Sequence, residues 1–262
     1  MHTDKQLSAL GVPFQVATAV DQFHPSVADC KSKQLPYIDG KGNPIRYLTT
    51  AEIGCVLSHM SIYRKMIDEN IDLACILEDD NDYDLDLKDL LVYDNINVTN
   101  WELLFLGHHG CIPDKGARSR MKKKLKLNGY YIGEPVEAPR GTYAYIIRKS
   151  AAIKLYQHCF PVRMPADHYT GHASALGIKS FVLSPPCAFS NPSFDSTIHD
   201  HEEIVYLNQE LFLEQCKVRI REFCKKFSWL YAAWVWIAAN RYLLLIVLRK
   251  AGLIKNTYAQ LK

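Results

Sequence analysis

Five acidic side chains crowd into seven residues of the chain, from Glu78 to Asp84. They follow an apolar run, residues 72–77, that predicts a short buried strand. Carboxylates this close repel one another, and a divalent cation would relieve the repulsion. Mg²⁺ and Mn²⁺ choose carboxylate oxygens and commonly share them with substrate phosphates. The stretch therefore indicates a hard-cation site beside a phosphorylated ligand, with an acidic loop that begins a helix as the alternative.

A calcium-binding loop of the EF-hand type is excluded at the same place. Asp80, Asp82 and Asp84 match the first three ligand positions of such a loop. Leu85 stands where the loop requires glycine, and Leu91 stands where it requires glutamate. An EF-hand therefore does not explain the acidic stretch.

The elements around this stretch follow from apolar periodicity and capping residues. Thr49 and Glu52 form a capping box, and a core stripe continues from there to about Asn70, which predicts a long helix. Residues 18–48 show no period and are predicted to form a loop. Further strands are predicted at 14–17, 101–106, 142–147 and 179–183, and further helices at 3–10, 149–160, 202–226 and 229–249. Strands that alternate with helices predict one α/β domain with a mixed, mostly parallel sheet and a C-terminal helical tail.

The composition is that of a globular protein with a sizeable core. The 262 residues are 48% hydrophobic and 23% charged, which excludes a disordered chain. Eight cysteines stand without a Cys-x-x-Cys pair, which excludes a zinc knuckle and a thioredoxin-like site. Residues 1–5 lack the apolar core of a signal peptide. We therefore expect reduced thiols in a cytoplasmic protein.

The charge of the chain is divided unequally. Residues 217–262 carry ten basic side chains and one acid, whereas residues 1–216 carry 21 basic and 27 acidic side chains. A protein that binds nucleic acid through its whole surface does not have this distribution. An acidic catalytic body with a basic tail fits it better, and no nucleic-acid partner is expected.

The basic tail also contains the most apolar stretch of the chain, residues 229–248. Its length is near the ~20 residues that span a bilayer, but Asn240 and Arg241 lie inside it, and a mid-helix Arg costs about 2.5–3.5 kcal/mol on insertion. Its tryptophans, tyrosines and flanking basic residues favour a helix on an anionic membrane surface, with residues 217–262 as the contact. A helix packed on the domain and a true membrane span are the alternatives.

A second basic run places seven cations in the twelve residues 115–126. A solvated loop is one interpretation. The other is a flap that attracts a phosphorylated ligand or a lipid headgroup.

Four motifs resemble one known family, in its order and with plausible spacing. GCVLSHMSIYRKMIDENIDLACILEDD at residues 54–80 resembles the central signature of glycosyltransferase family 25, the bacterial lipopolysaccharide and lipooligosaccharide glycosyltransferases. Gly141–Ile147 resembles the Gly-Thr-x-Ala-Tyr strand of that family, Pro165–Tyr169 its Pro-x-Asp element, and Ser196–Ile198 its late Ser-x-Ile. The resemblance covers about residues 5–200 and divides the chain into a catalytic domain, 1–205, and a tail, 206–262.

The resemblance implies a glycosyltransferase A-type, Rossmann-like fold and an inverting transferase. The donor would be a UDP-sugar, most often UDP-galactose, and the acceptor a lipooligosaccharide or another glycan. A divalent metal, Mn²⁺ or Mg²⁺, would neutralise the pyrophosphate of the leaving group. Such an enzyme would work at the cytoplasmic face of the bacterial inner membrane, as a peripheral protein.

The resemblance also assigns roles around the acidic stretch. Side chains alternate along an extended segment, so Glu78 and Asp80 share a face and Asp79 lies on the other. Asp80 is the main candidate metal ligand, with Glu78 assisting or reaching the ribose, and Asp79 is placed at the donor. Ser58 and His59 are also candidates for the donor site. For His59, support of residues 78–80 and a place in the core are alternatives.

Two more residues are candidates on the acceptor side. Thr142 contacts the acceptor or serves strand packing. Inversion needs one base to take the proton of the acceptor hydroxyl, and Asp167 is the candidate. The alternatives for Asp167 are a metal or acceptor contact and the N-cap of the following helix.

The sequence departs from the family pattern at its start. Family members open with an apolar strand at the nucleotide pocket, whereas this chain enters the following helix at once. We therefore expect either a truncated start or a chain that lacks this strand. This departure favours a catalytically impaired relative that binds membrane or glycan, whereas the intact residues 78–80 favour an active enzyme. A metal-dependent phosphohydrolase fits less well, because it needs a second metal site that the sequence does not supply.

Overall fold

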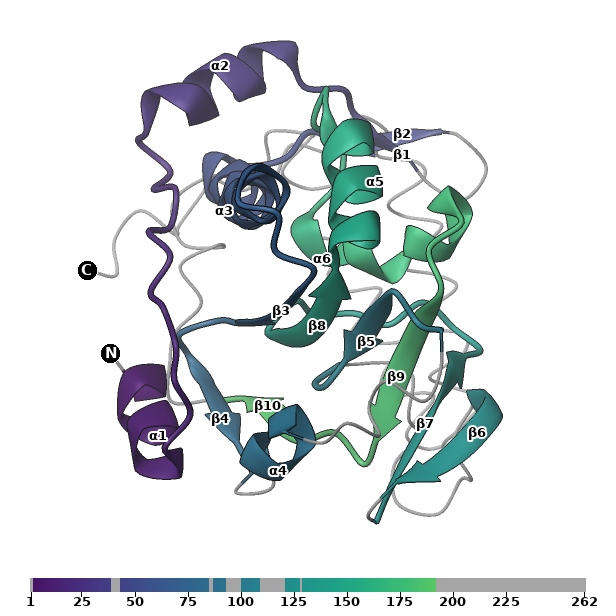
Figure 1. Cartoon of the computed structure of the whole chain (residues 1–262). Coiled ribbons are helices and arrows are strands. Elements are labelled where there is room, and N and C mark those ends of the chain that lie inside the picture. Colours follow the sequence, from purple (N-terminus) through teal and green to yellow (C-terminus); the bar gives the residue numbers. More distant parts are fainter. Residues whose placement is uncertain are drawn as a thin grey trace, which may run out of the picture. The chain divides into compact units, whose positions relative to one another are not determined.

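A mixed six-stranded sheet forms the centre of the computed structural model, which describes residues 2–38, 43–84, 87–92, 100–108, 121–127 and 129–191 (Figure 1). Its strands lie in the order β3-β8-β5-β9-β7-β6. Their bounds are β3, Leu73–Leu77; β8, Ala144–Arg148; β5, Leu103–Phe105; β9, Ser180–Ser184; β7, Tyr130–Pro135; and β6, Met121–Leu127.

The prediction of a mostly parallel sheet is wrong. Only β5 and β9 pair in parallel among these six strands, and the other four pairings are antiparallel. β6 and β7 follow each other directly and turn near Gly129, whose φ of 86° suits glycine, so they pair as a hairpin. β8 lies between β3 and β5 and runs against both, although a long stretch of chain separates it from β3. Alternation along the sequence did not reveal this neighbour order.

Two helices cover one face of the sheet. α3 (Thr50–Asp68) has the predicted capping box, because Thr49 and Glu52 satisfy each other's backbone N–H groups. Arg46 pairs with both carboxylate oxygens of Glu52 at 2.6 Å and fixes this end of the helix. α5 (Lys149–Cys159) packs beside α3 on the same face (Figure 1). The core beneath them includes Ile53, Val56, Met60, Tyr145 and Leu155.

Smaller elements cover the other face. α4 (Leu87–Val92) lies there with a two-stranded ribbon of β4 (Asn81–Tyr83) and β10 (Ala188–Ser190) (Figure 1). α1 (His2–Leu10) packs on β4, and His2 and Gln6 both contact the Asp82 carboxylate, at 2.7 and 2.8 Å. The core of this face includes Trp101, Leu104, Ile146, Phe181 and Leu183.

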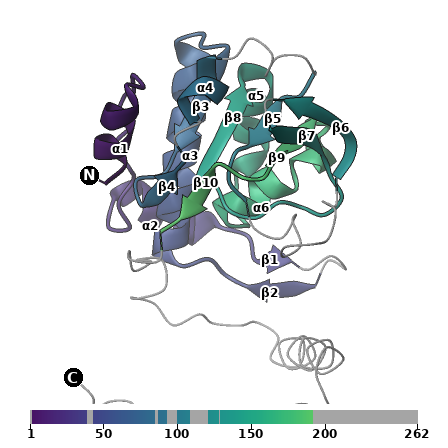
Figure 2. The same cartoon turned by 90° about the horizontal axis from the view of Figure 1, so that it is seen from below.

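The structure corrects two local predictions near the N-terminus. Residues 14–17 form no strand, and the predicted loop 18–48 contains α2 (Pro25–Lys33), β1 (Tyr37–Ile38) and β2 (Pro44–Arg46). Figure 2 shows β1 and β2 as a ribbon outside the central sheet. Val27 is the one residue of α2 that is buried, so the helix has almost no apolar period to detect.

The second basic run is partly a strand rather than a loop. Its last residues belong to β6, which forms an edge of the sheet. Lysines on an edge strand discourage pairing with another chain, so this position explains much of the charge without a ligand. Residues 115–120 of the run lie outside the described residues.

Contacts along the chain divide it after Val205. The predicted tail 206–262, with its basic residues 217–262 and its apolar stretch 229–248, lies outside the described residues, as does the Ser196–Ile198 motif. None of the helices that the structure describes has both the length and the apolar character needed to cross a membrane.

Candidate active site

Antiparallel pairing of β3 with β8 brings two distant segments together at one sheet edge. Leu77, the last residue of β3, pairs with Ala144, the first residue of β8. The carbonyl of Tyr143 accepts hydrogen bonds from the Glu78 N–H at 3.0 Å and the Asn81 side chain at 3.2 Å. The acidic stretch after β3 therefore lies against the residues that precede β8.

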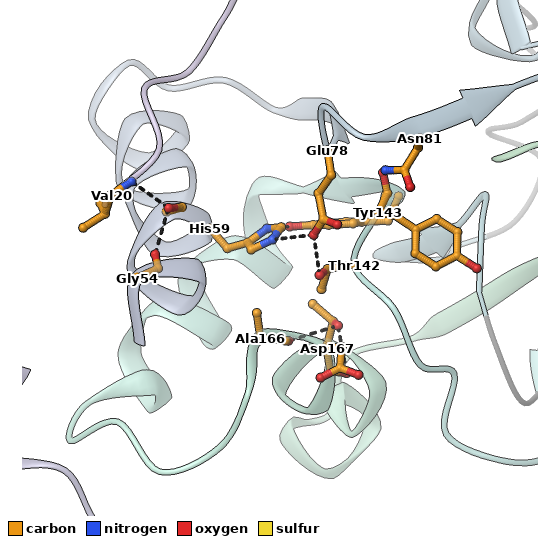
Figure 3. A network of polar contacts seen from close by, with 12 residues as sticks. Val20, Gly54, His59, Glu78, Asn81, Thr142, Tyr143, Ala166 and Asp167 are labelled. Atoms are coloured by element: carbon orange, nitrogen blue, oxygen red, sulfur yellow. Dashed lines mark hydrogen bonds and ion pairs between the residues drawn. The ribbon is translucent and has the colours of Figure 1, made fainter. Parts of the chain in front are cut away.

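Glu78 is held by side chains from two other elements (Figure 3). The Thr142 hydroxyl donates to Glu78 Oε1 at 2.6 Å, and His59 Nε2 lies 3.2 Å from the same oxygen. The Glu78 backbone carbonyl accepts hydrogen bonds from the hydroxyls of Thr3 and Tyr83. Both side-chain contacts use Oε1, and Oε2 has no hydrogen-bond partner in the part of the chain that the structure describes, so Oε2 can contact a ligand.

His59 is buried in the core with its two ring nitrogens engaged. Nδ1 lies 2.8 Å from the Tyr145 hydroxyl, which in turn lies 2.7 Å from the Tyr63 hydroxyl. Burial lowers the pKa of His59, but hydrogen bonds to Cys55 and Glu78 outweigh it and raise the pKa. Burial likewise raises the pKa of Glu78, but the contacts with His59 and Thr142 lower it overall. The two side chains therefore form a charged pair at neutral pH.

The pKa of Asp80 is shifted in the opposite direction to that of Glu78. Asp80 is half-buried, and its pKa is raised, first by burial and then by the charges of Glu78 and Asp79. Among the described residues Asp80 has no ion-pair partner. Asp79 is exposed. A half-buried carboxylate beside a second one fits a divalent cation with oxygen ligands, since the cation would stabilise the ionised form.

A second set of possible metal ligands shares Glu78. The ligand atoms of Cys55, His59 and Glu78 all lie within 4.8 Å of one another. A thiolate, an imidazole and a carboxylate suit Zn²⁺ better than Mg²⁺ or Mn²⁺. We did not select Cys55 from the sequence, although its spacing of four residues from His59 on a predicted helix was the available signal.

Ser58 links the backbone of α3 to the segment around Val20. Its hydroxyl donates to the Gly54 carbonyl and accepts from the Val20 N–H, both at 2.8 Å (Figure 3). A Cβ at Gly54 would lie 2.7 Å from the Val20 carbonyl oxygen, so only glycine allows this approach. The Gly and Ser of the 54–80 signature therefore dock the segment around Val20 onto α3, and the predicted donor contact of Ser58 stays a prediction.

Asp167 lies in the first turn of α6 (Ala166–Gly171), whose N-cap is Pro165. The N-cap alternative for Asp167 is therefore wrong. Figure 3 draws Asp167 below Thr142, on the side away from Glu78. A Cβ at Gly171 would collide with the Pro139 carbonyl oxygen, so α6 packs closely on the segment that leads to Thr142.

The candidate residues thus fall into three groups. His59 and Thr142 both contact Glu78. Among the described residues Asp80, two residues further along the chain, makes no hydrogen bond to any of these three side chains. Ser58 accepts a hydrogen bond from the Val20 backbone. Asp167 is drawn on the side of Thr142 that faces away from Glu78 (Figure 3). Tyr145, which was not among the predicted site residues, lies inside the Gly141–Ile147 motif and orients His59.

An α/β domain with a carboxylate pair at one sheet edge is the class that the fold and the site define. The family model described as glycosyltransferase family 25 (LPS biosynthesis protein) matches residues 1–170. The chain therefore belongs to glycosyltransferase family 25.

Three curated relatives are each similar to part of this chain. Human procollagen galactosyltransferase 2 is 28% identical over 168 residues, which cover 60% of this chain and 25% of that protein. A glycosyltransferase 25 family member of Aedes aegypti is 29% identical over 61% of this chain and 26% of its own length. Human inactive glycosyltransferase 25 family member 3 is 25% identical over 59% of this chain and 26% of its own. The matches with these relatives span about a quarter of their length.

Proposed function

We propose that the protein transfers a hexose, most simply galactose, from a UDP-sugar to a glycan acceptor with inversion. The observation that carries the proposal is the sheet-edge site in which His59 and Thr142 hold Glu78 beside Asp80. Membership of glycosyltransferase family 25 and the similarity to a galactosyltransferase support the reaction class and the sugar. A glycosyltransferase A-type fold and a lipooligosaccharide acceptor belong to the same proposal.

The donor side of the site is assigned to the two carboxylates. Asp80 is the main ligand of a divalent metal, Mn²⁺ or Mg²⁺, and the second oxygen of Glu78 assists it. When bound, the metal neutralises negative charge on the pyrophosphate of the leaving UDP. His59 and Thr142 hold the Glu78 carboxylate in one orientation, so no reorganisation is needed as the charge develops.

The acceptor side is assigned to Asp167. Its carboxylate takes the proton from the acceptor hydroxyl as that oxygen bonds to the anomeric carbon. The bond from that carbon to the UDP oxygen breaks in the same displacement, and UDP leaves with the electron pair. Asp167→Asn is expected to lower kcat by about 100-fold with less than twofold change in the KM for the UDP-sugar. A larger change in donor KM than in kcat would assign Asp167 to binding instead.

Residues 217–262 are proposed to hold the enzyme on an anionic membrane surface, at the cytoplasmic face of the inner membrane. Ten basic side chains and the apolar stretch 229–248 support this role.

A catalytically impaired relative that binds glycan or membrane is the second candidate. The similarity to a protein named as inactive favours it, whereas the retained Glu78, Asp79 and Asp80 favour the enzyme.

The experiment is UDP release from UDP-galactose, UDP-glucose and UDP-N-acetylglucosamine by the full chain. Truncated lipooligosaccharide or a simple glucoside or lactoside serves as acceptor, with Mn²⁺ and then with EDTA. Metal-dependent release that requires one donor and an acceptor supports the transferase. Binding of UDP or glycan without any release supports the impaired relative.

A further inference from the structure

An open cavity of about 390 Å³ lies beside the candidate base. One wall is the segment Glu137–Arg140, which leads directly to Thr142. The other wall is formed by Asp167, His168 and His172. Because Thr142 also donates to Glu78, one short segment reaches both this cavity and the carboxylate of the proposed donor site.

The imidazoles of the second wall are held in place before any ligand binds. His168 Nδ1 lies 2.9 Å from the Tyr37 hydroxyl, and the two rings meet edge to face at 5.2 Å. The His172 ring stacks on the His168 ring at 5.7 Å, and its Nδ1 donates to the His168 carbonyl at 3.0 Å. The cavity wall is therefore preorganised, which lowers the cost of ordering it on binding.

The hydrogen bonds also determine which ring nitrogen atoms the two imidazoles can offer to a ligand. A carbonyl only accepts, so Nδ1 of His172 carries a proton, and among the described residues its Nε2 has no hydrogen-bond partner, so Nε2 can contact a ligand. Burial lowers the pKa of His168, and His172, Arg140 and Arg46 add to this while Asp167 opposes it. The surroundings of His168 therefore disfavour its charged form.

The remaining charges in the cavity are mixed. Arg140 contributes five N–H donors, and its side chain forms no ion pair with another described residue. Glu137 and Asp167 also line the cavity, and both carry carboxylates. Two carboxylates disfavour an anionic ligand, whereas the donors of Arg140 near the Asp167 acceptor suit a neutral molecule with several hydroxyl groups.

We propose that this cavity binds the acceptor as a neutral hexose residue, with Arg140 and His172 as the residues that recognise it. The proposal rests on the proposed function, because a neutral sugar here offers a hydroxyl to Asp167. It goes beyond that function by naming the acceptor pocket, its specificity residues and the charge of the sugar.

The test compares His172→Ala and Arg140→Ala with a matched control in the full chain. His158→Ala is the control, because His158 makes the same hydrogen bond from Nδ1 to the carbonyl four residues earlier but lies on α5, outside the cavity. Each cavity variant is expected to raise the acceptor KM by about tenfold, the loss of one good hydrogen bond, with the KM for the UDP-sugar changed less than twofold. Equal changes in both KM values, or no change in acceptor KM, would overturn the assignment.

Direct binding keeps this test separate from the proposed activity. Saturation-transfer NMR with methyl galactoside, methyl glucoside and methyl glucuronide reports sugar binding even if no UDP is released. We expect a neutral glycoside to bind wild type and His158→Ala, and its signal to be lost in His172→Ala and Arg140→Ala. Preferential binding of the glucuronide would overturn the neutral class, and an unchanged signal in both cavity variants would overturn the pocket.

Discussion

Asp80 is the side chain on which the metal assignment turns. Its raised pKa reflects burial and neighbouring carboxylates, whereas Glu78 is already paired with His59. Asp80→Asn is expected to lower metal-dependent turnover by about 100-fold, because the amide is a poorer ligand for a hard cation. The Tm should change by less than about 2 °C, since removal of a repelling charge costs little stability. Kinetics across a Mn²⁺ titration and thermal melts measure both.

Cys55→Ser is the informative comparison for this variant. It removes the sulfur ligand of the Cys55, His59 and Glu78 set and leaves Asp80 intact. We expect its Mn²⁺ dependence to match wild type. If Cys55→Ser abolished the metal response while Asp80→Asn retained it, the metal would belong to the set that includes sulfur.

The pair of His59 and Glu78 predicts a pH dependence of stability with two limits. The pKa of His59 is raised to about 10 in the folded protein. The contribution of His59 to the free energy of unfolding is therefore complete below the usual pKa of histidine and is lost as the pH rises through about 10. The pKa of Glu78 is lowered, so its contribution is present above its usual pKa and is lost as the pH falls through the folded value. We expect Glu78→Gln to melt below wild type at neutral pH, with the difference shrinking at both extremes. Glu69→Gln, an exposed position, should give a small difference that does not vary this way.

At the scale of elements, helix α3 both positions a candidate active-site residue and anchors a neighbouring segment of the chain. Its buried face bears His59, and one residue earlier Ser58 binds the segment around Val20. Ser58→Ala leaves the Val20 N–H without its acceptor and is expected to cost about 1–3 kcal/mol in the free energy of unfolding.

Ser61→Ala is the matched control for that prediction. Ser61 also donates to a carbonyl of α3, that of Ser58, but it is exposed and forms no hydrogen bond to another described element. Its loss should cost less than about 0.5 kcal/mol. Urea-induced unfolding measures the stability of both variants. A Ser58→Ala protein with wild-type stability but a raised KM for the UDP-sugar would instead support the donor contact predicted for Ser58.

At the scale of the whole molecule, the unequal charge predicts membrane binding through the tail. The full chain is expected to sediment with vesicles that contain anionic lipid and not with purely zwitterionic ones, and high salt should release it. Deletion of residues 227–262 should abolish sedimentation, because it removes the apolar stretch and half of the tail's cations. A truncated chain that still sediments would exclude the tail as the anchor.

Local features of the molecule could be predicted from the sequence. The capping box at Thr49 and Glu52, strand β3, strand β8 and helix α5 depend on neighbouring residues and on short apolar periods, and all four form as expected. The acidic stretch after β3 could also be found from the sequence, because its residues are neighbours along the chain. Helix α2 was missed because one buried residue does not make a period. The strand predicted at 14–17 was wrong because this short segment, with three apolar residues, found no partner strand among the described residues.

The sequence by itself determined the capped start of α3, the buried runs of β3 and β8, the carboxylates that follow β3 and the family that the motifs resemble. Only the tertiary structure decided the strand directions, the β6–β7 hairpin, the pairing of Glu78 with His59 and Thr142, and the cavity between Arg140 and His172. Caps and periods act over a few residues, so the local sequence contains them. Glu78 lies 19 residues from His59 and 64 from Thr142 along the chain, and such contacts depend on which strands become neighbours and in what register.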